Sequence, residues 1–488
     1  MLQRVVRSTV IDAPIARVWA LLRDFNSHGQ WHSAVAQSRI EGGEKSDQIG
    51  CIRAFTLQDG NTIREQLLTL DDQARKSTYC IVQASVPLQR YVATLTLKPV
   101  TDGERTFWHW ESTFATPPGR ENELRDMVAQ GVYEMGFNDL RRYLQRGGDL
   151  RSPGSTPMPT ALPLPTRRIA VTHYGGPDSL VVQDAVAPAP GRGEVRIQQR
   201  AIGVNYLDIY LRRGWIPLML AEGGTPGMEA AGAVIDAGAG FGAFFPGDRV
   251  AYLCPTPGAY ASVRTLPSAW VLRLPPEIED DVAAAFLLKG LTADYLLHDL
   301  GRVKPGMKLL VHAAAGGVGL LLCAWAKRLG ATVIGTVSSE DKARVARSHG
   351  CEHVIVTLNY QFAEAVQDLT RGGADIVVDG LGDAAREENL RALARCGHWI
   401  SLGQASGPLQ PIDPDALALK SLSFSRPVVF DYVATPEALR QRALRVFNLL
   451  ADATHARPPI ERHALQAAAQ AHERLESRRT IGALILTV

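Results

Sequence analysis

The pattern of apolar and polar residues differs between the two parts of the chain. Residues 1–146 begin with a run that alternates with period two, as in a half-buried strand. Ile15, Trp19 and Leu22 then recur at helical spacing, and five further alternating runs follow, separated by polar or glycine-bearing turns. An amphipathic helix from Gly119 to Tyr143 closes this part. The order of strand, helix, several strands and long helix predicts one α+β domain over residues 1–146.

A different pattern follows. Residues 147–166 contain five prolines and no apolar periodicity. Proline cannot continue a helix, so we expect an extended linker here rather than a long loop inside one domain. Beyond it, residues 307–339 form an apolar strand, a glycine-rich turn, a helix and a second strand, which predicts a parallel α/β sheet. The fold class is therefore multidomain, α+β followed by α/β.

Composition narrows the class of protein. A length of 488 residues is too great for one ordinary core, so two or three domains are expected. The net charge of +2 argues against nucleic acid as a partner. The chain has no run of about 18 apolar residues, so no membrane span is expected. Six cysteines lack CxxC spacing, and the amino terminus lacks the apolar core of a secretory signal, so a cytoplasmic location is expected.

The glycine-rich turn is the clearest candidate site. Ala314, Gly316 and Gly319 have the spacing of a G-x-G-x-x-G motif, with alanine in the first place. Small residues are needed there because the turn is tight and the backbone must approach a pyrophosphate. The amides around Gly317, Val318 and Gly319, at the start of the helix, would face its negative charge. The turn predicts a dinucleotide-binding domain.

The end of the second strand bears on the choice of nicotinamide cofactor. An NAD site commonly has a carboxylate at this position, whereas this chain has Ser338–Ser339. Serine can donate to a 2′-phosphate, and Lys342 and Arg344 on the following helix could neutralise it. The alternative is that Glu340 and Asp341, one step further, reach the ribose of NADH. The missing carboxylate favours NADPH.

Residues 1–146, with the opening APIARVWALLRDFNSHGQWH, resemble the START-like, polyketide cyclase-like (SRPBCC) superfamily. The resemblance implies a helix-grip fold around an apolar cavity that binds a hydrophobic or aromatic small molecule, sometimes with cyclase chemistry. Because side chains alternate along a strand, Trp108 and Trp110 share one face and His109 the other. The alternative is that these aromatic residues are simply core. The candidate pocket residues are Trp31, Tyr79, Trp108 and Trp110.

Residues 167–488 resemble zinc-free NADPH:quinone oxidoreductases of the medium-chain dehydrogenase/reductase superfamily. The segments that carry the resemblance are HYGGPDSL, AIGVNYLDIYLRRG, TPGMEAAG, GDRVAY, FLLKGLTADYLL, HAAAGGVG, GTVSSEDKA and AHERLESRRT. It implies a GroES-like catalytic domain, in two parts at 167–288 and 430–488, that is interrupted by a Rossmann domain at 289–429. It also implies a homodimer joined through the Rossmann sheets and hydride transfer to a quinone or an α,β-unsaturated carbonyl compound.

No zinc is expected. Where zinc-dependent relatives have a cysteine and a histidine ligand, this chain has Asn205 and Met228, so a tetrahedral site lacks two of its ligands. Residual ligation by Asp208, Glu229 and a histidine is the alternative. Flavin is not expected either, and catalysis would then depend on positioning the nicotinamide above the acceptor.

The resemblance also implies the site residues, although each could instead make a structural hydrogen bond, and for Asp208 a buried structural role is the expectation. The family's tyrosine that grips the 2′-phosphate falls near Thr357, with Tyr360 three residues on as the alternative. The implied catalytic residues are Asn205, Tyr206, Asp208, Tyr210 and Lys289. The implied cofactor-binding residues are Thr292, Ala314, Gly316, Gly317, Val318, Gly319, Ser338, Ser339, Lys342, Thr357, Gly403, Gln404 and Arg478.

Three functions fit these features. In the first, the N-terminal domain binds an apolar or aromatic molecule and the remainder reduces a quinone or enone with NADPH. In the second, the acceptor is an acyclic enone, as in polyketide enoyl reduction. In the third, the chain is a non-catalytic binding protein that senses the redox state through NADPH.

Overall fold

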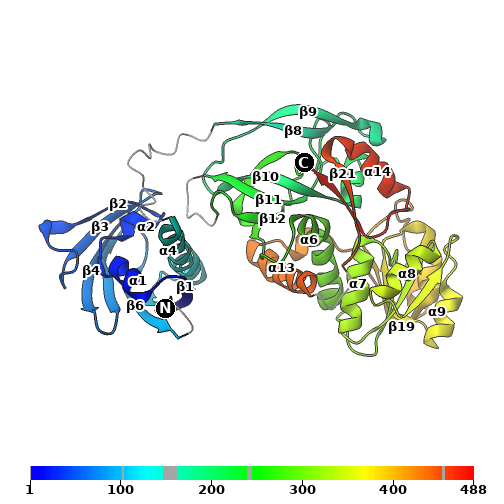
Figure 1. Ribbon diagram of the computed structural model, residues 1–488. Coiled ribbons are helices and arrows are strands. Elements are labelled where there is room, and N and C mark those ends of the chain that lie inside the picture. The colour runs from blue at the N-terminus through cyan, green and yellow to red at the C-terminus, as the bar shows by residue number, and fades with distance from the viewer. Residues whose placement is uncertain (1, 102–103, 147–161, 239–243, 453–456) are drawn as a thin grey trace. The chain divides into compact units, whose positions relative to one another are not determined.

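The computed structural model describes residues 2–101, 104–146, 162–238, 244–452 and 457–488. The chain divides into two compact units, one formed mainly by residues up to Leu162 and the other by most residues from Pro163 onward (Figure 1). Most of the expected linker, residues 147–161, lies outside the described residues, and strand β8 (Leu164–Val171) begins within its last part.

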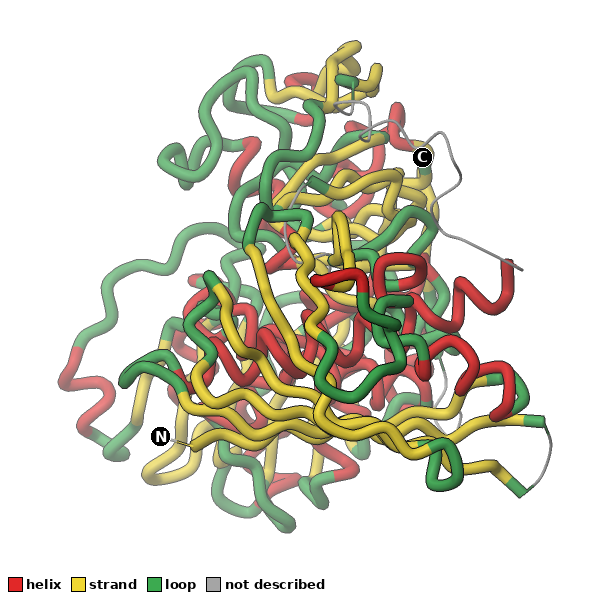
Figure 2. Tube along the Cα trace, turned by 90° about the vertical axis from the view of Figure 1, so that its left-hand side faces the viewer, coloured by secondary structure: helices red, strands yellow, loops and turns green. Residues whose placement is uncertain are grey.

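The first unit contains one antiparallel sheet of seven strands in the order β1-β7-β6-β5-β4-β3-β2. Strands are yellow in Figure 2. The alternation seen in the sequence is present: along β7, every second residue from Thr106 to Phe114 is buried. The strands are β1 (Leu2–Ile11), β2 (Val35–Ile40), β3 (Ile52–Leu57), β4 (Thr62–Asp71), β5 (Lys76–Ala84), β6 (Gln89–Val100) and β7 (Arg105–Ala115).

Helices of the first unit pack on the inner face of this sheet. After β1 come two short helices, α1 (Ile15–Arg23) and α2 (His28–Trp31). The expected closing helix is present, and its backbone is helical from α3 (Glu121–Asp126) through a π-helical stretch, Met127–Glu134, to α4 (Met135–Arg146). Large aromatic side chains fill the space between the helices and the sheet.

The second unit contains two further sheets and a β8–β9 hairpin. One is mixed, with the order β14-β12-β11-β10-β22-β21 and with β13 paired to β10. Since β21 and β22 come from the end of the chain, the two expected parts of the catalytic domain share one sheet. Its strands are β10 (Glu194–Val204), β11 (Glu229–Ala237), β12 (Arg249–Leu253), β13 (Val263–Pro267), β14 (Val271–Arg273), β21 (Ile460–Ala464) and β22 (Ala483–Thr487), and the hairpin adds β9 (Leu180–Ala187).

The other sheet of this unit is the expected parallel one. Its order, β17-β16-β15-β18-β19-β20, reverses beside β15, and every pairing in it is parallel. In such a sheet ligands bind beyond the carboxyl ends of the strands at this reversal. The strands are β15 (Lys308–His312), β16 (Thr332–Val337), β17 (His353–Val356), β18 (Ala374–Asp379), β19 (Leu393–Ser401) and β20 (Ser423–Ser425).

Helix α6 (Asp280–Tyr295) positions part of the site. From Ala283 to Tyr295 every residue is buried, which is the pattern of a helix that is covered on all sides. It packs on α7, α13, β12 and β22, and so joins the parallel sheet to the mixed one. The other helices are α5 (Tyr206–Arg212), α7 (Gly317–Arg328), α8 (Glu340–Ser348), α9 (Ala363–Thr370), α10 (Arg386–Ala392), α11 (Pro414–Ala418), α12 (Val429–Tyr432), α13 (Pro436–Ala451) and α14 (Ala468–Glu476).

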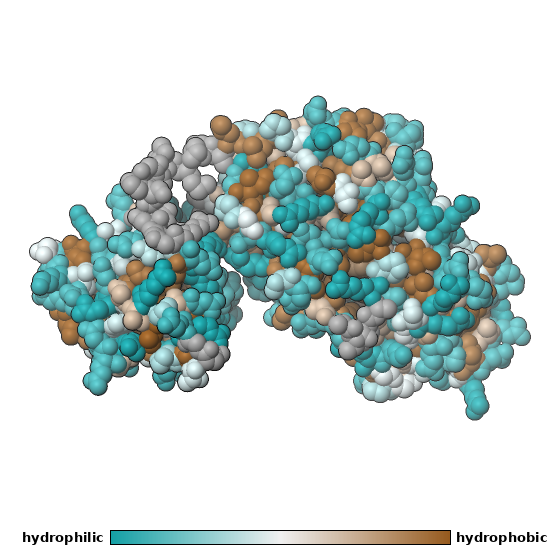
Figure 3. Space-filling view, viewed as in Figure 1, coloured by the Kyte–Doolittle hydropathy of each residue, from teal (hydrophilic) through white to brown (hydrophobic). Residues whose placement is uncertain are grey.

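The surface on the face shown in Figure 3 is mostly hydrophilic, with apolar patches interspersed. Among the helices that the structure describes, none combines the length and apolar character needed to cross a membrane.

Candidate active site

The glycine-rich turn connects β15 to α7, at the reversal of the parallel sheet. Helix α7 begins at Gly317, and its first amides have no carbonyl partner within the helix. A side chain on Gly317 would place its Cβ 2.6 Å from Cδ of Lys289, and one on Gly319 would collide with the carbonyl of Ala313. Gly316 pairs with Gly482 in an isolated parallel bridge. The turn therefore leaves open backbone amides against α6, which fits a pyrophosphate group.

Four side chains gather beyond the end of β16. The ammonium of Lys342 donates to Oγ of Ser338 at 3.2 Å and to the backbone carbonyl of Arg478. The Arg478 guanidinium donates to the hydroxyl of Tyr360. Both Tyr360 and Arg478 have left-handed backbones, with φ of 60° and 58°. Two cations and two hydroxyls in one corner form a set of donors suited to a 2′-phosphate.

The two remaining residues expected in this corner bond elsewhere. The hydroxyl of Thr357 donates to Oδ1 of Asn359 at 3.1 Å, so the structure brings Tyr360 rather than Thr357 to Arg478. Ser339 caps α8, because its hydroxyl accepts from the Lys342 amide at 3.4 Å.

A buried charged cluster lies against the glycine-rich turn. Lys289 of α6 donates to Oδ1 of Asn205 at 2.8 Å, and its ammonium lies 3.5 Å from a carboxylate oxygen of Glu229. The side-chain amide of Asn205 in turn donates to Glu229 at 2.8 Å. Burial raises the pKa of the Glu229 carboxyl and lowers that of the Lys289 ammonium, while their mutual attraction opposes both shifts.

Asp208 closes this cluster from α5. Its Oδ2 accepts from the backbone amide of Asn205 at 2.8 Å and from the hydroxyl of Tyr260 at 3.2 Å. Burial, and then the neighbouring Glu229 charge, raise the pKa of Asp208 to about 7, against the opposing effect of these hydrogen bonds and of Lys289. Asp208 is thus buried, as expected, and its structural partner is the backbone amide of Asn205 at the start of α5.

Two tyrosines on α5 connect it to neighbouring segments. Tyr206 donates to the carbonyl of Leu475 at 3.1 Å, and burial raises its pKa to about 12. The Tyr210 hydroxyl accepts from the amide of Gln404 at 2.9 Å, in the loop after β19. Burial also raises the pKa of Tyr210.

The other candidate residues lie around the same reversal of the sheet. Thr292, one turn after Lys289, donates within α6 to the carbonyl of Leu288 at 2.8 Å. Gly403 approaches the carbonyl of Gly380 so closely that an added Cβ would lie 2.9 Å from it. The side chain of Gln404 accepts from Arg426 at 2.7 Å.

The positions of the zinc ligands in relatives do not fit a metal ion here. Asn205 uses both side-chain atoms on Lys289 and Glu229, and Met228 is completely buried. Within the described part of the chain, no three His, Cys, Asp or Glu side chains are grouped so that they could hold a metal.

In the first unit, the four candidate pocket residues meet on the inner face of the sheet. Trp108 stacks on Trp110 with ring centroids 5.2 Å apart, and Trp31 meets Trp108 edge-on at 6.0 Å. The indole N–H of Trp110 donates to the Tyr79 hydroxyl at 3.0 Å. All four are almost fully buried.

Sequence reasoning missed Tyr260 and His472. His472 is completely buried, and its ring lies within hydrogen-bonding distance of the Tyr260 hydroxyl, 3.0 Å away. Tyr260 lies in a loop and His472 in α14, so no local spacing connects them with Asp208. The only signal was that His472 falls within the segment AHERLESRRT.

Comparisons with known proteins agree with this geometry. Residues 3–145 match the family "Polyketide cyclase / dehydrase and lipid transport". Residues 191–276 match "Alcohol dehydrogenase GroES-like domain", and residues 317–447 match "Zinc-binding dehydrogenase".

Individual relatives cover the second unit. A quinone oxidoreductase of Pseudomonas aeruginosa is 41% identical over 66% of this chain and 99% of its own length. A 2-haloacrylate reductase of Burkholderia sp is 40% identical over 65% and 98%. The solved Escherichia coli quinone oxidoreductase complexed with NADPH superimposes with a TM-score of 0.62, at 36% identity over 66% of this chain and all of that one. The chain therefore belongs to the quinone oxidoreductase family of medium-chain dehydrogenases and reductases, with a polyketide cyclase-type domain at its N-terminus.

Proposed function

We propose that the second unit is an NADPH-dependent reductase that transfers a hydride to a quinone or an α,β-unsaturated carbonyl compound. The observation that carries this proposal is the position of Lys289 directly against the glycine-rich turn, with its ammonium bound to the side chain of Asn205. When bound, NADPH supplies the hydride. The names of the relatives, quinone oxidoreductase and 2-haloacrylate reductase, both describe reduction of a conjugated acceptor.

The residues of this chain bind and orient the two reactants. The open amides at Gly317 to Gly319 would hold the pyrophosphate. Ser338, Lys342, Tyr360 and Arg478 would hold the 2′-phosphate, and this corner is the support for NADPH over NADH. Lys289 and Asn205 present an ammonium and an amide where the nicotinamide end of the cofactor would lie.

The test is NADPH consumption by the purified full-length protein with menadione, methyl vinyl ketone, crotonyl thioester and chloroacrylate. Turnover of menadione supports the quinone reductase, and turnover of the acyclic acceptors alone supports the enoyl reductase. NADPH binding without consumption of any acceptor supports the non-catalytic sensor and contradicts the proposal.

We also infer that the first unit has a helix-grip fold and binds an oxygenated aromatic molecule. Cyclase activity on that molecule would need an assay of its own. Its core holds three polar atoms that have no hydrogen-bond partner among the described residues: Arg53 Nε, Trp108 Nε1 and Thr116 Oγ1. Buried polar atoms are normally satisfied, so a ligand with carbonyl or hydroxyl oxygens would supply the missing partners. Native mass spectrometry of the purified protein tests this, because a bound small molecule adds its mass to the chain.

The assembly and location follow from the family resemblance. We infer a cytoplasmic homodimer that is joined at the edge of the parallel sheet, where the three-residue strand β20 lies outermost. Sedimentation equilibrium tests this inference, and a monomer at micromolar concentration contradicts it.

A further inference from the structure

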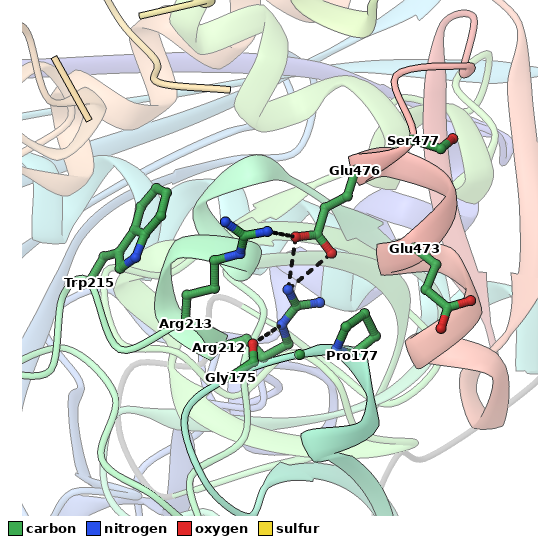
Figure 4. Close-up of a pocket in the computed structure, with 9 residues that line it drawn as sticks. Gly175, Pro177, Arg212, Arg213, Trp215, Glu473, Glu476 and Ser477 are labelled. Atoms are coloured by element: carbon green, nitrogen blue, oxygen red, sulfur yellow. Dashed lines mark hydrogen bonds and ion pairs between the residues drawn. The ribbon is translucent and has the colours of Figure 1, made fainter. Parts of the chain in front are cut away.

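A line of buried side chains leads from a surface pocket to the candidate active site. The pocket in Figure 4 has a volume of about 660 Å³ and is lined in part by Arg212 and Glu476, which are joined by two hydrogen bonds of 2.9 and 3.0 Å. Another N–H of the completely buried Arg212 lies 3.4 Å from Nδ1 of His472. His472 meets Tyr260, and Tyr260 meets Asp208.

The hydrogen bonds of this line have one consistent direction. A guanidinium can only donate, so Nδ1 of His472 accepts from Arg212. Burial and the Arg212 charge lower the pKa of His472 to about 3, so the ring is neutral and its Nε2 carries the hydrogen. Nε2 therefore donates to the Tyr260 oxygen, which leaves the hydroxyl hydrogen for Asp208. From Arg212 inward, each of these hydrogen bonds is donated in the direction of Asp208.

Asp208 is surrounded by groups of both charges. Glu229 on β11 opposes the carboxylate form, and Lys289 on α6 favours it. Its Oδ2 receives both available hydrogen bonds, from Asn205 and Tyr260, while the buried Oδ1 has no partner among the described residues. The carboxylate is therefore held by two donors, and the loss of either should shift its protonation equilibrium.

We propose that Tyr260 and His472 are positioning residues, which hold Asp208 as a carboxylate and thereby fix Asn205 at the start of α5 beside Lys289. Protonation of Asp208 weakens the hydrogen bond that it accepts from the backbone amide of Asn205 and removes a negative charge near Lys289. Where activity is the readout, this inference rests on the proposed reductase function.

The first test is Tyr260→Phe in the full-length protein, with kcat/KM for acceptor reduction measured against pH. We expect kcat/KM of the unmodified protein to fall as the pH drops through about 7, the pKa of Asp208. Removing a hydrogen bond to the charged form raises a carboxyl pKa, so this limb should move up by about one pH unit.

The matched control is Tyr252→Phe. Tyr252 is also a completely buried tyrosine of this unit, but its hydroxyl donates to Gln199, outside the line. The Tyr252→Phe variant should lose about as much unfolding free energy as Tyr260→Phe, but its kcat/KM should keep the pH profile of the unmodified protein. If Tyr260→Phe and Tyr252→Phe give the same profile as the unmodified protein, the proposal is wrong.

A second pair of variants tests His472. His472→Gln keeps an N–H that can reach the Tyr260 oxygen, whereas His472→Leu removes it. We expect the leucine variant to shift the limb toward higher pH and the glutamine variant to restore it. Equal profiles for the two variants would mean that His472 has only a packing role.

The pH dependence of NADPH binding separates this inference from the proposed function. If no acceptor is reduced, the reductase proposal fails, and the same variants are compared by fluorescence titration of NADPH at several pH values. A binding curve that shifts in Tyr260→Phe but not in Tyr252→Phe supports the positioning role. Coinciding curves overturn it.

Discussion

At the scale of single residues, the proposed preference for NADPH depends on the charges around Ser338. Lys342 is anchored by Ser338 and by the carbonyl of Arg478, so its ammonium is held in place before any ligand arrives. Arg344, two residues further along the same helix, instead pairs with Asp341 at 3.0 Å. Of the two cations expected from the sequence to neutralise a 2′-phosphate, the geometry favours Lys342.

Lys342→Ala should therefore raise the dissociation constant for NADPH by about tenfold, the value of one charge-assisted hydrogen bond, and leave that for NADH nearly unchanged. Arg344→Ala is the matched control on α8 and should change neither constant. Fluorescence titration with both cofactors measures these effects. Equal losses for NADPH and NADH would contradict the assignment.

His472 predicts a pH dependence of stability. In the folded protein its pKa is about 3, below the ordinary histidine value of 6.5, so the unfolded chain binds a proton at pH values where the folded protein does not. This contribution is fully present above pH 6.5 and is lost as the pH falls toward about 3. Between pH 7 and about pH 5, the unfolding free energy of His472→Gln should therefore fall by about 2 kcal/mol less than that of the unmodified protein. Urea unfolding at both pH values measures it, and equal losses in the two proteins would refute it.

Single residues also mark the limit of prediction from sequence. Ser338, Lys342 and Arg478 could be proposed from the sequence because they follow recognisable strands and motifs. Tyr360 was only an alternative to Thr357, because the loop after β17 is irregular and its backbone turns left-handed at Tyr360. Contacts such as that between Tyr260 and His472 join residues more than two hundred positions apart, and period and spacing carry no information about them.

At the scale of elements, the turn between β15 and α7 depends on the absence of side chains. Gly317→Ala would push a methyl group against Lys289, so both NADPH affinity and kcat/KM should fall by about tenfold or more. Thermal unfolding shows whether the variant is folded. In a Lys289→Ala background the same change should cost much less, because the clashing side chain is gone. Equal costs in both backgrounds would exclude this clash as the cause.

Periodicity predicted most elements well. The alternating strands of the first unit and the strand–turn–helix at Gly317 are formed where the sequence placed them. The π-helical stretch at Met127–Glu134 was not predicted, since its apolar residues read equally well as an ordinary helix. Sheet order was also beyond the sequence pattern, because β22 joins β10 from the opposite end of the chain.

At the scale of the whole molecule, the division into two units predicts independent folding. The residues proposed to bind NADPH all lie after Pro163, and the aromatic core of the first unit contributes none of them. The chain from Pro163 to Val488 should therefore fold alone and keep the KM for NADPH within about twofold. Expression of this piece and steady-state kinetics test it. A raised KM for the acceptor alone would indicate that the first unit delivers the substrate.

The left-handed backbones of Tyr360 and Arg478 have a consequence for evolution. A residue other than glycine costs about 1 kcal/mol or more in this conformation, so the pair lowers the folding equilibrium constant by roughly thirtyfold. Glycine at either position would stabilise the chain and at the same time remove a group proposed to recognise the 2′-phosphate. Selection for heat resistance alone would therefore tend to erase the preference for NADPH, and the persistence of these residues in a lineage would record selection for cofactor choice.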